Sequence, residues 1–475
     1  MPCLVGLTNM RREIRMSKDD KMLSGHVQLI RCFESSRQML FKRYEKVVGL
    51  SMIYAQMRTV AILVVVLETA VWGHPVIPAS DQKEPIALIN GIIHPANGET
   101  IKGGSILFSD GKILAVGKNI SLPPDAIQID VNGDHIYPGL FNTGGQLGLV
   151  EVNSVRATKD YSEAGSLNPN VRAAAAVNPD SEAIPVTRSN GVLITLTIPT
   201  GGLISGKSAV LQLDGWTWED LSLKTEAGVH VNWPSNNDGL KRLESFFDTA
   251  IEYRKRRDQS SDQREDLRLA GLLPVLNGQI PLIAHADSLA TIRSAVSFAN
   301  TYGIKLVIHG GYDAERCANL LRENNVPVIV GSVYRLPRRR SDFFDDAYTL
   351  PARLDAAGVK FCISGVSRFG ASNLRNLPYH AATAIAYGLD KDEALRSITI
   401  HPAEILGVSD RIGTLEPKKD ATLIVTNGDL FETATNVRFA FVAGRRLDLN
   451  DRHRILWEKY RTKYERQGLL QKSSE

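Results

Sequence analysis

The sequence predicts an α/β fold with a parallel sheet in its middle and β structure at both ends. From Pro281 onward, short apolar strands alternate with helical patterns, and repeated strand–helix units indicate a parallel sheet, either doubly wound or closed as a barrel. Residues 86–131 and 413–449 instead show short strands separated by turns. Two β segments at opposite ends of a chain can combine into one sandwich, from which the middle emerges as a separate domain.

The middle elements follow from hydrophobic periodicity. A strand over 281–285 precedes apolar residues at helical spacing, and Asp287 is the expected N-cap of that helix. Strands this apolar are expected where helices cover a sheet. The remaining expected elements are strands over 191–199, 208–213, 304–310, 326–332 and 358–364, and helices over 239–269, 313–323 and up to Tyr387.

Three turn dipeptides divide the β segment at the start of this region. Asn90-Gly91, Asp110-Gly111 and Asn132-Gly133 separate alternating apolar runs. Asn-Gly and Asp-Gly accept the left-handed backbone conformation that tight hairpin turns require. All three are therefore predicted to be turns between strands.

Composition limits the classes of function. The 475 residues suffice for one large domain plus a smaller one. The net charge of +4 arises in residues 1–56, so the main body is near neutral and no nucleic-acid partner is expected. No cysteine pair has CxxC spacing, which argues against a disulfide framework or a cysteine-based zinc site. Cys317 and Cys362 are expected to be buried thiols.

Residues 57–80 have the pattern of a signal peptide. Arg58 gives a basic start, a short apolar core follows, and small residues and prolines end the segment. The core is short for a membrane span of about 20 residues and contains Glu68, although an uncleaved anchor stays open as an alternative. Residues 1–56 are an upstream leader extension without a motif. The mature protein is expected to begin near Ser80 and to be periplasmic or secreted, with membrane contact only through an uncleaved leader.

Two histidines end consecutive strands of the predicted parallel sheet. His285 and His309 are 24 residues apart, which is one strand–helix repeat. Active sites of βα barrels lie at the C-terminal ends of the strands, and neighbouring strands are about 4.8 Å apart. The two imidazoles could therefore approach a common metal or a substrate. The alternative is that each is a hydrogen-bonded histidine at a strand end.

Several segments together resemble the amidohydrolase superfamily, and within it the imidazolonepropionase-like branch of secreted bacterial proteins. The matching segments are "NGIIHPANGETIKGGSILFSDGKILAVG", "HIYPGL", the two strand-end histidines, "AYGLDKDEALRSITIHPAEILGV" and "GTLEPKKDATLIV". The resemblance covers nearly all of residues 84–449. It implies a TIM-like (β/α)8 barrel over 136–404, flanked by a small composite β-sandwich from residues 84–135 and 405–450.

The resemblance also implies a metal site, and this sequence departs from it. The family places a metal-binding His-x-His pair after its "PGL" strand, where residues 142–146 here read "NTGGQ". It places a metal-binding aspartate, which accepts a proton from water, where Gly365 or Val366 stands. His285 and His309 match, so the resemblance implies a degenerate metal site holding one divalent metal, zinc first, or none. Replacement ligands would come from Gln146, Asp287, Asp313 and His380.

Two polar segments lie between the predicted elements. Residues 155–192 follow the first barrel strand, and a loop there would overlie the barrel mouth. The candidate substrate-binding residues are Gln146, Arg156, Tyr161 and Arg172, and the alternative is a solvated loop. Residues 335–351 are expected to form an ordered loop whose charges pair locally or face water.

Two functions fit these observations. The first is a hydrolase that acts on a carbon–nitrogen bond other than a peptide bond, including cyclic amides, with an altered metal site around His285 and His309. Its catalytic residues are not identifiable. The alternative is a catalytically inactive small-molecule-binding protein on an amidohydrolase scaffold. Either protein takes a small-molecule substrate or ligand, and a homodimer is one expected assembly.

Overall fold

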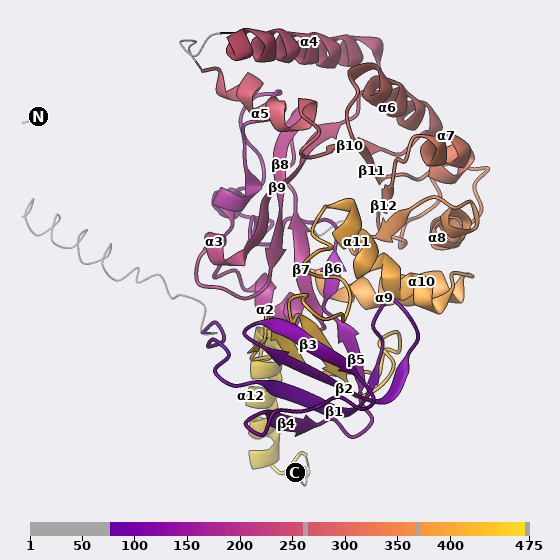
Figure 1. Cartoon of the computed structure of the whole chain (residues 1–475). Coiled ribbons are helices and arrows are strands. Elements are labelled where there is room, and N and C mark those ends of the chain that lie inside the picture. The colour runs from indigo at the N-terminus through magenta and orange to yellow at the C-terminus, as the bar shows by residue number, and fades with distance from the viewer. Residues whose placement is uncertain (1–76, 260–264, 367–370, 471–475) are drawn as a thin grey trace, which may run out of the picture. The chain divides into compact units, whose positions relative to one another are not determined.

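Two eight-stranded sheets organise the chain, one closed nearly into a barrel and one beside it (Figure 1). The computed structural model describes residues 77–259, 265–366 and 371–470. The leader extension 1–56 and most of the predicted signal segment 57–80 lie outside these residues, so both stay predictions.

The flanking sheet contains strands from both ends of the described chain. Its order is β16-β15-β14-β5-β1-β2-β3, with β4 beside β1. The antiparallel pairing of β14 with β5 joins the two sets, and apolar residues of both sets share one core. The strands are β1 (Ile86–Ile93), β2 (Ile101–Ser109), β3 (Lys112–Gly117), β4 (Ile127–Asp130), β5 (His135–Pro138), β14 (Leu423–Thr426), β15 (Val437–Val442) and β16 (Arg445–Arg446).

One of the three predicted turns is a bulge. Asp110-Gly111 links β2 to β3, and Asn132-Gly133 lies between β4 and β5. Asn90-Gly91 instead lies inside β1, where the register against β2 shifts and Asn90 has a φ of 61°. A bulge, like a hairpin turn, can use a residue in the left-handed region, so the dipeptide alone does not distinguish the two. The prediction of a turn there was wrong.

The second sheet is a TIM-like barrel, as the sequence predicted. Its order is β13-β12-β11-β10-β9-β8-β7-β6, and the five strands β9 to β13 run parallel. The strands are β6 (Leu140–Asn142), β7 (Val192–Thr197), β8 (Ile204–Gln212), β9 (Ser222–Asn232), β10 (Leu282–Ala286), β11 (Leu306–Gly310), β12 (Val328–Val330) and β13 (Phe361–Ile363).

Strand β8 departs from eightfold (β/α) symmetry, because it runs antiparallel to both β7 and β9. Antiparallel neighbours need no crossover helix, and only the one-turn α3 (Trp218–Leu221) separates β8 from β9. Part of the polar segment that was expected over the mouth runs beside β8. Isolated bridges join Leu167 to Ile204 and Arg172 to Lys207 of β8, and a third joins Ser162 to Thr200 just before β8.

Helices connect the other barrel strands. Ser288, rather than Asp287, caps α6: its side chain accepts a hydrogen bond from Thr291 N, and the Thr291 side chain accepts one from Ser288 N. No helix in the described ranges is long and apolar enough to cross a membrane. The helices are α2 (Ala183–Arg188), α4 (Asn237–Gln259), α5 (Leu267–Leu276), α6 (Leu289–Tyr302), α7 (Ala318–Glu323), α8 (Asp346–Ala356), α9 (Leu377–Ala386), α10 (Lys391–Ser397), α11 (Ile400–Ile405) and α12 (Arg452–Arg466). Short 3-10 helices are η1 (Arg156–Thr158), η2 (Ala173–Ala176), η3 (Ala314–Cys317) and η4 (Leu374–Asn376).

Cys317 and Cys362 are buried free thiols, as predicted. Burial raises the pKa of the Cys362 thiol to about 12, which leaves it protonated at neutral pH.

A buried ion-pair triad joins the barrel to the flanking sheet. Asp214 lies just after β8. One of its carboxylate oxygens forms an ion pair with Arg188 Nη1 at 3.1 Å, and the other forms an ion pair with Arg445 Nη2 at 3.3 Å. Asp214 and Arg188 are 1% and 4% exposed, so removing Asp214 would leave the buried Arg188 guanidinium without its carboxylate partner.

Side chains close the seam between the two end strands of the barrel sheet, β6 and β13. Asn142 Oδ1 accepts a hydrogen bond from Gly365 N at 2.8 Å, and Thr143 Oγ1 donates to Ile363 O at 3.4 Å. Asn142 and Thr143 are both fully buried. The seam therefore depends on two polar side chains in an apolar surrounding.

Substitution Asn142→Ala should destabilise the barrel, because Gly365 N would lose its partner inside the protein. A buried donor left unsatisfied costs about 1–3 kcal/mol, and we expect a loss of that size in the free energy of unfolding measured with urea. Asn119→Ala, at an exposed position, is the matched control and should change it by less than about 0.5 kcal/mol. An equal effect of both substitutions would show that the seam does not depend on Asn142.

Candidate functional site

Three histidines meet at the C-terminal ends of strands β9, β10 and β11. His285 and His309 are direct partners in the parallel ladder, with ring centroids 4.4 Å apart. His230 lies on β9, and its Nδ1 is 2.8 Å from His285 Nε2. The structure thus brings the two predicted histidines together and adds a third.

The sequence reasoning missed His230 because no strand was expected over 222–232. The first half of β9 is polar ("SLKTE"), and only its second half alternates apolar residues around His230. A third histidine one strand before His285, flanked by Val229 and Val231, was the signal that could have found it.

Burial keeps this histidine trio (His230, His285 and His309) neutral. Desolvation lowers the pKa of His285 to about 4 and lowers the pKa values of His230 and His309 well below 6.5. Because neutral imidazole has one donor and one acceptor nitrogen, the hydrogen bond between His230 and His285 couples their tautomers. His230 Nε2 and His309 Nε2 are buried and have no hydrogen-bond partner within the described residues.

Gly144 faces His309 at the position where the resemblance would put a metal-binding histidine. A Cβ atom on Gly144 would lie 3.3 Å from His309 Nε2 and 2.8 Å from Val366 Cγ2. Gly144 has no side chain and Val366 presents a methyl group, so neither can donate to a metal. The side-chain oxygen beside this position is the hydroxyl of the buried Ser364, 3.0 Å from the same Cβ. Gln146, the other position of the pair, is partly buried.

The carboxylates that could have replaced those ligands form ion pairs with arginines. Asp287 pairs with Arg335 Nη1 at 3.3 Å and with Arg338 Nη1 at 2.8 Å. Asp313 pairs with Arg339 Nη2 at 2.5 Å, and it also accepts a hydrogen bond from the Leu289 N–H at the start of α6. Arg339 also pairs with Asp342 Oδ1 at 2.9 Å within segment 335–351, whereas the pairs with Asp287 and Asp313 reach outside the segment.

The ring of Tyr312 lies against these arginines. Its ring lies 5.1 Å from the guanidinium carbon of Arg335, and Arg338 and Arg339 are within 5.8 Å. The positive charge of Arg335 also contributes to the lowered pKa of His309. Arg335 Nε and Nη2 are buried without a partner among the described residues, so this cation lies near the trio with unused donors.

His380, another candidate ligand, lies on α9 against Tyr334, with ring centroids 4.4 Å apart. Burial lowers its pKa to about 4. Its Nδ1 has no partner in the described part of the chain, and no hydrogen bond found there links it to the histidine trio.

The residues present do not fit the metal site that the resemblance implies. Among the described residues, no group of three or more His, Cys, Asp or Glu side chains is arranged to hold a metal ion. Catalytic zinc takes three protein ligands and a water. Here His285 Nε2 is hydrogen-bonded to His230, Gly144 and Val366 lack donor atoms, and the cation Arg335 is close to His309.

The predicted substrate-binding residues do not converge with the histidines. Arg156 and Arg172 are exposed, and Tyr161 packs partly buried against the small core beneath residues 147–185. Within the described ranges, no hydrogen bond or ion pair links these three residues to the trio. Their roles, and that of Gln146, stay predictions.

Sequence comparison supports the resemblance. Residues 295–447 match the model of the amidohydrolase family. The chain is 23% identical to an amidohydrolase (tasK) of Hapsidospora irregularis over 380 residues, and 30% identical to the imidazolonepropionase of Mesorhizobium japonicum over 148 residues. These matches cover 69% and 31% of this chain, but only 38% and 34% of the two relatives.

Solved structures agree in fold. An amidohydrolase from Thermotoga maritima superposes with a TM-score of 0.71 at 27% identity, covering 76% of this chain and 99% of that one. Molinate hydrolase, at 16% identity and a TM-score of 0.50, shares the fold alone. The barrel and its flanking sheet thus have the fold of the Thermotoga maritima amidohydrolase. The chain contains an amidohydrolase family domain, and its similarity extends to the imidazolonepropionases.

The buried histidines should make stability depend on pH. In the unfolded chain His285 has a pKa near 6.5, whereas in the folded chain its pKa is about 4. Below pH 6.5 the unfolded state binds a proton that the folded state does not bind, so the free energy of unfolding falls as the pH falls toward 4. One such group lowers the free energy of unfolding by up to about 2 kcal/mol between pH 7 and pH 5.

Urea unfolding at pH 7 and pH 5 measures this effect. His285→Gln should reduce the pH-dependent loss of stability, whereas His453→Gln, at an exposed position, should leave it unchanged. A loss that is equally large in the His285→Gln variant would contradict the assignment of His285 as a buried neutral group.

Proposed function

We propose that this protein binds a small organic molecule at the barrel mouth and lacks the metal-dependent water activation of its family. One observation carries the proposal: Gly144 and Val366, which have no donor atoms, stand next to His309 where metal ligands would be needed. This supports a mouth that keeps polar groups for binding without the ligands that would hold a water-activating metal.

The histidine trio suits recognition of a neutral polar molecule. Neutral imidazoles donate and accept hydrogen bonds without introducing charge. His309 Nε2 is one such group with no partner within the described residues, and Arg335 adds unused donors nearby. An amide or nitrogen heterocycle, the compound class suggested by the names of the relatives, presents the complementary donors and acceptors.

The same groups are poorly suited to be the general base of a hydrolase. Asp287 and Asp313 are paired with arginines, and the imidazoles have pKa values far below neutral. A general base works best with a pKa near the working pH. These properties support binding over hydrolysis.

A second candidate is hydrolysis of a carbon–nitrogen bond other than a peptide bond, including that of a cyclic amide, with an altered metal site. The favouring observation is the concentration of three imidazoles, with His285 and His309 in register and His230 2.8 Å from His285. Imidazole is a preferred zinc ligand, and the relatives are hydrolases. In this case the trio would have to rearrange to accept the ion.

Location and partners are part of the proposal. Secretion or a periplasmic location rests on residues 57–80. A small molecule is the proposed partner, without nucleic acid, and a homodimer is the proposed assembly.

Elemental analysis of the purified chain tests the proposal. We expect well under 0.5 equivalents of zinc, iron or manganese, and no hydrolysis of imidazolone propionate or of a panel of cyclic amides. The triple variant Gly144→His/Gln146→His/Val366→Asp restores the missing donors and should bind zinc measurably better than the natural chain. Val366→Asp also removes the methyl group that a Cβ at position 144 would approach at 2.8 Å.

The control is the double variant His285→Ala/His309→Ala. Near-stoichiometric metal in the natural chain that disappears in this variant would overturn the proposal and favour the altered metallohydrolase. Val366→Asp alone, which leaves Gly144 without a side chain, should gain less zinc affinity than the triple variant.

A further inference from the structure

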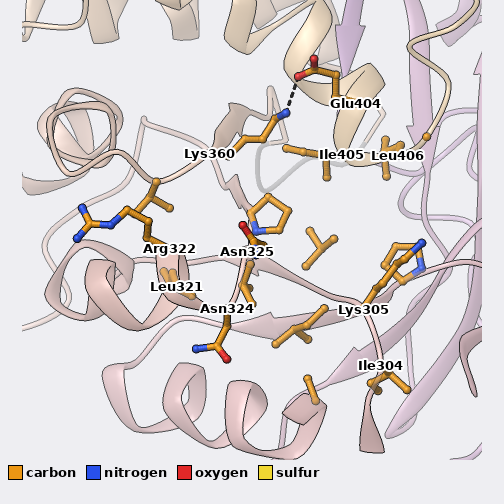
Figure 2. Close-up of a pocket in the computed structure, with 18 of the residues that line it drawn as sticks. Ile304, Lys305, Leu321, Arg322, Asn324, Asn325, Lys360, Glu404, Ile405 and Leu406 are labelled. Carbon is orange, nitrogen blue, oxygen red and sulfur yellow. Dashed lines mark ion pairs between the residues drawn. The ribbon is translucent and has the colours of Figure 1, made fainter. Parts of the chain in front are cut away.

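A cavity of about 610 Å³ opens at the end of the barrel opposite the histidine trio (Figure 2). Four of the residues that line it immediately precede barrel strands: Pro281, Lys305, Pro327 and Lys360. Their carbonyls accept ladder hydrogen bonds from neighbouring strands, for example Lys305 O from Leu282 N at 2.9 Å. The backbone around this opening is therefore held in place.

Apolar side chains form part of the cavity wall. They come from the strand starts, from the end of α7 and from the end of α11, and include Leu306, Leu321, Val326, Val359, Ile405 and Leu406. A cavity of this volume, whose wall combines apolar and polar surface in about equal parts with a few placed charges, can take a small amphipathic molecule.

Its charged groups are predominantly cationic. Lys360 is neutralised by Glu404, whose Oε2 lies 2.6 Å from the Lys360 Nζ, as Figure 2 shows. Arg322 has no ion pair with a carboxylate among the described residues, but it donates to Ala357 O and to Asn319 Oδ1, which hold two of its N–H groups. Lys224 and Lys305 remain, and neither has an ion pair with a carboxylate among the described residues.

Lys224 and Lys305 are two like charges on one cavity. Lys224 Nζ donates to Leu406 O at 2.9 Å, and Lys305, an exposed residue, lies on the side of the cavity away from Lys360 and Glu404 (Figure 2). Burial lowers the pKa of Lys224, the charge of Lys305 lowers it further, and the carboxylate of Asp410 acts in the opposite direction. An anion between the two ammonium groups would relieve this repulsion, as opposite charges within a few ångströms favour both charged forms.

We propose that this cavity binds a small amphipathic carboxylate, with the carboxylate between Lys224 and Lys305 and the hydrocarbon part against the apolar wall. A simple inorganic anion would leave the apolar wall unused, and a neutral hydrocarbon would leave the two cations uncompensated. This site is separate from the barrel mouth and does not depend on what the mouth binds.

Isothermal titration of the full chain with octanoate tests the proposal, because octanoate combines a carboxylate with a flexible apolar chain. We expect one site per chain. Octanamide, which has the same shape without the charge, should bind at least tenfold more weakly, and inorganic phosphate should not compete at equal concentration.

Variants then locate the site. Lys305→Gln should weaken octanoate binding at least tenfold, and the charge-retaining Lys305→Arg should keep it within about threefold. Lys118→Gln, an exposed lysine of the flanking sheet region, is the matched control and should have no effect. Equal affinity for octanoate and octanamide, or unchanged binding in Lys305→Gln, would overturn the proposal. Competition by phosphate would reassign the cavity to a free anion and also overturn it.

Discussion

The hydrogen bond between Gly365 N and Asn142 Oδ1 is the contact on which the barrel mouth depends. It bridges β6 and β13, the two end strands of the barrel sheet, and it sits at the ends of both strands. By holding these strand ends together, it places Gly144 and Val366 beside His309. The same buried amide thus closes the barrel and determines which side chains the histidine trio faces.

The charges at the mouth are consistent with that arrangement. Where carboxylates remain, at Asp287 and Asp313, arginines of the following loop neutralise them. The histidines beside them are kept neutral by burial. A divalent cation would meet little negative charge here, whereas a polar neutral molecule would meet unused imidazole nitrogens. In the function proposed above, this balance of charge, more than the loss of any one ligand, is what would distinguish this mouth from a catalytic metal centre.

The sequence predicted the barrel class and the meeting of His285 and His309, because both histidines end strongly apolar strands one repeat apart. It could not predict His230, since the polar first half of β9 hides that strand and the antiparallel β8 breaks the repeat. It also missed the cap of α6: Asp287 has the right residue type, but Arg335 and Arg338 hold its carboxylate. Pairings between loops tens of residues apart leave no periodic signal, so only the folded chain reveals them.

The pairing of β14 with β5 has a consequence for the order of folding. Tyr137 and Ile424 are neighbours across this ladder although 287 residues separate them in the chain. During synthesis the N-terminal strands β1 to β5 emerge first, yet the edge of β5 stays uncovered until the whole barrel has been made. Contacts of such long sequence separation form slowly. The edge of β5 therefore stays unpaired while the rest of the chain is made, and an unpaired strand edge is a site where two incomplete chains can associate.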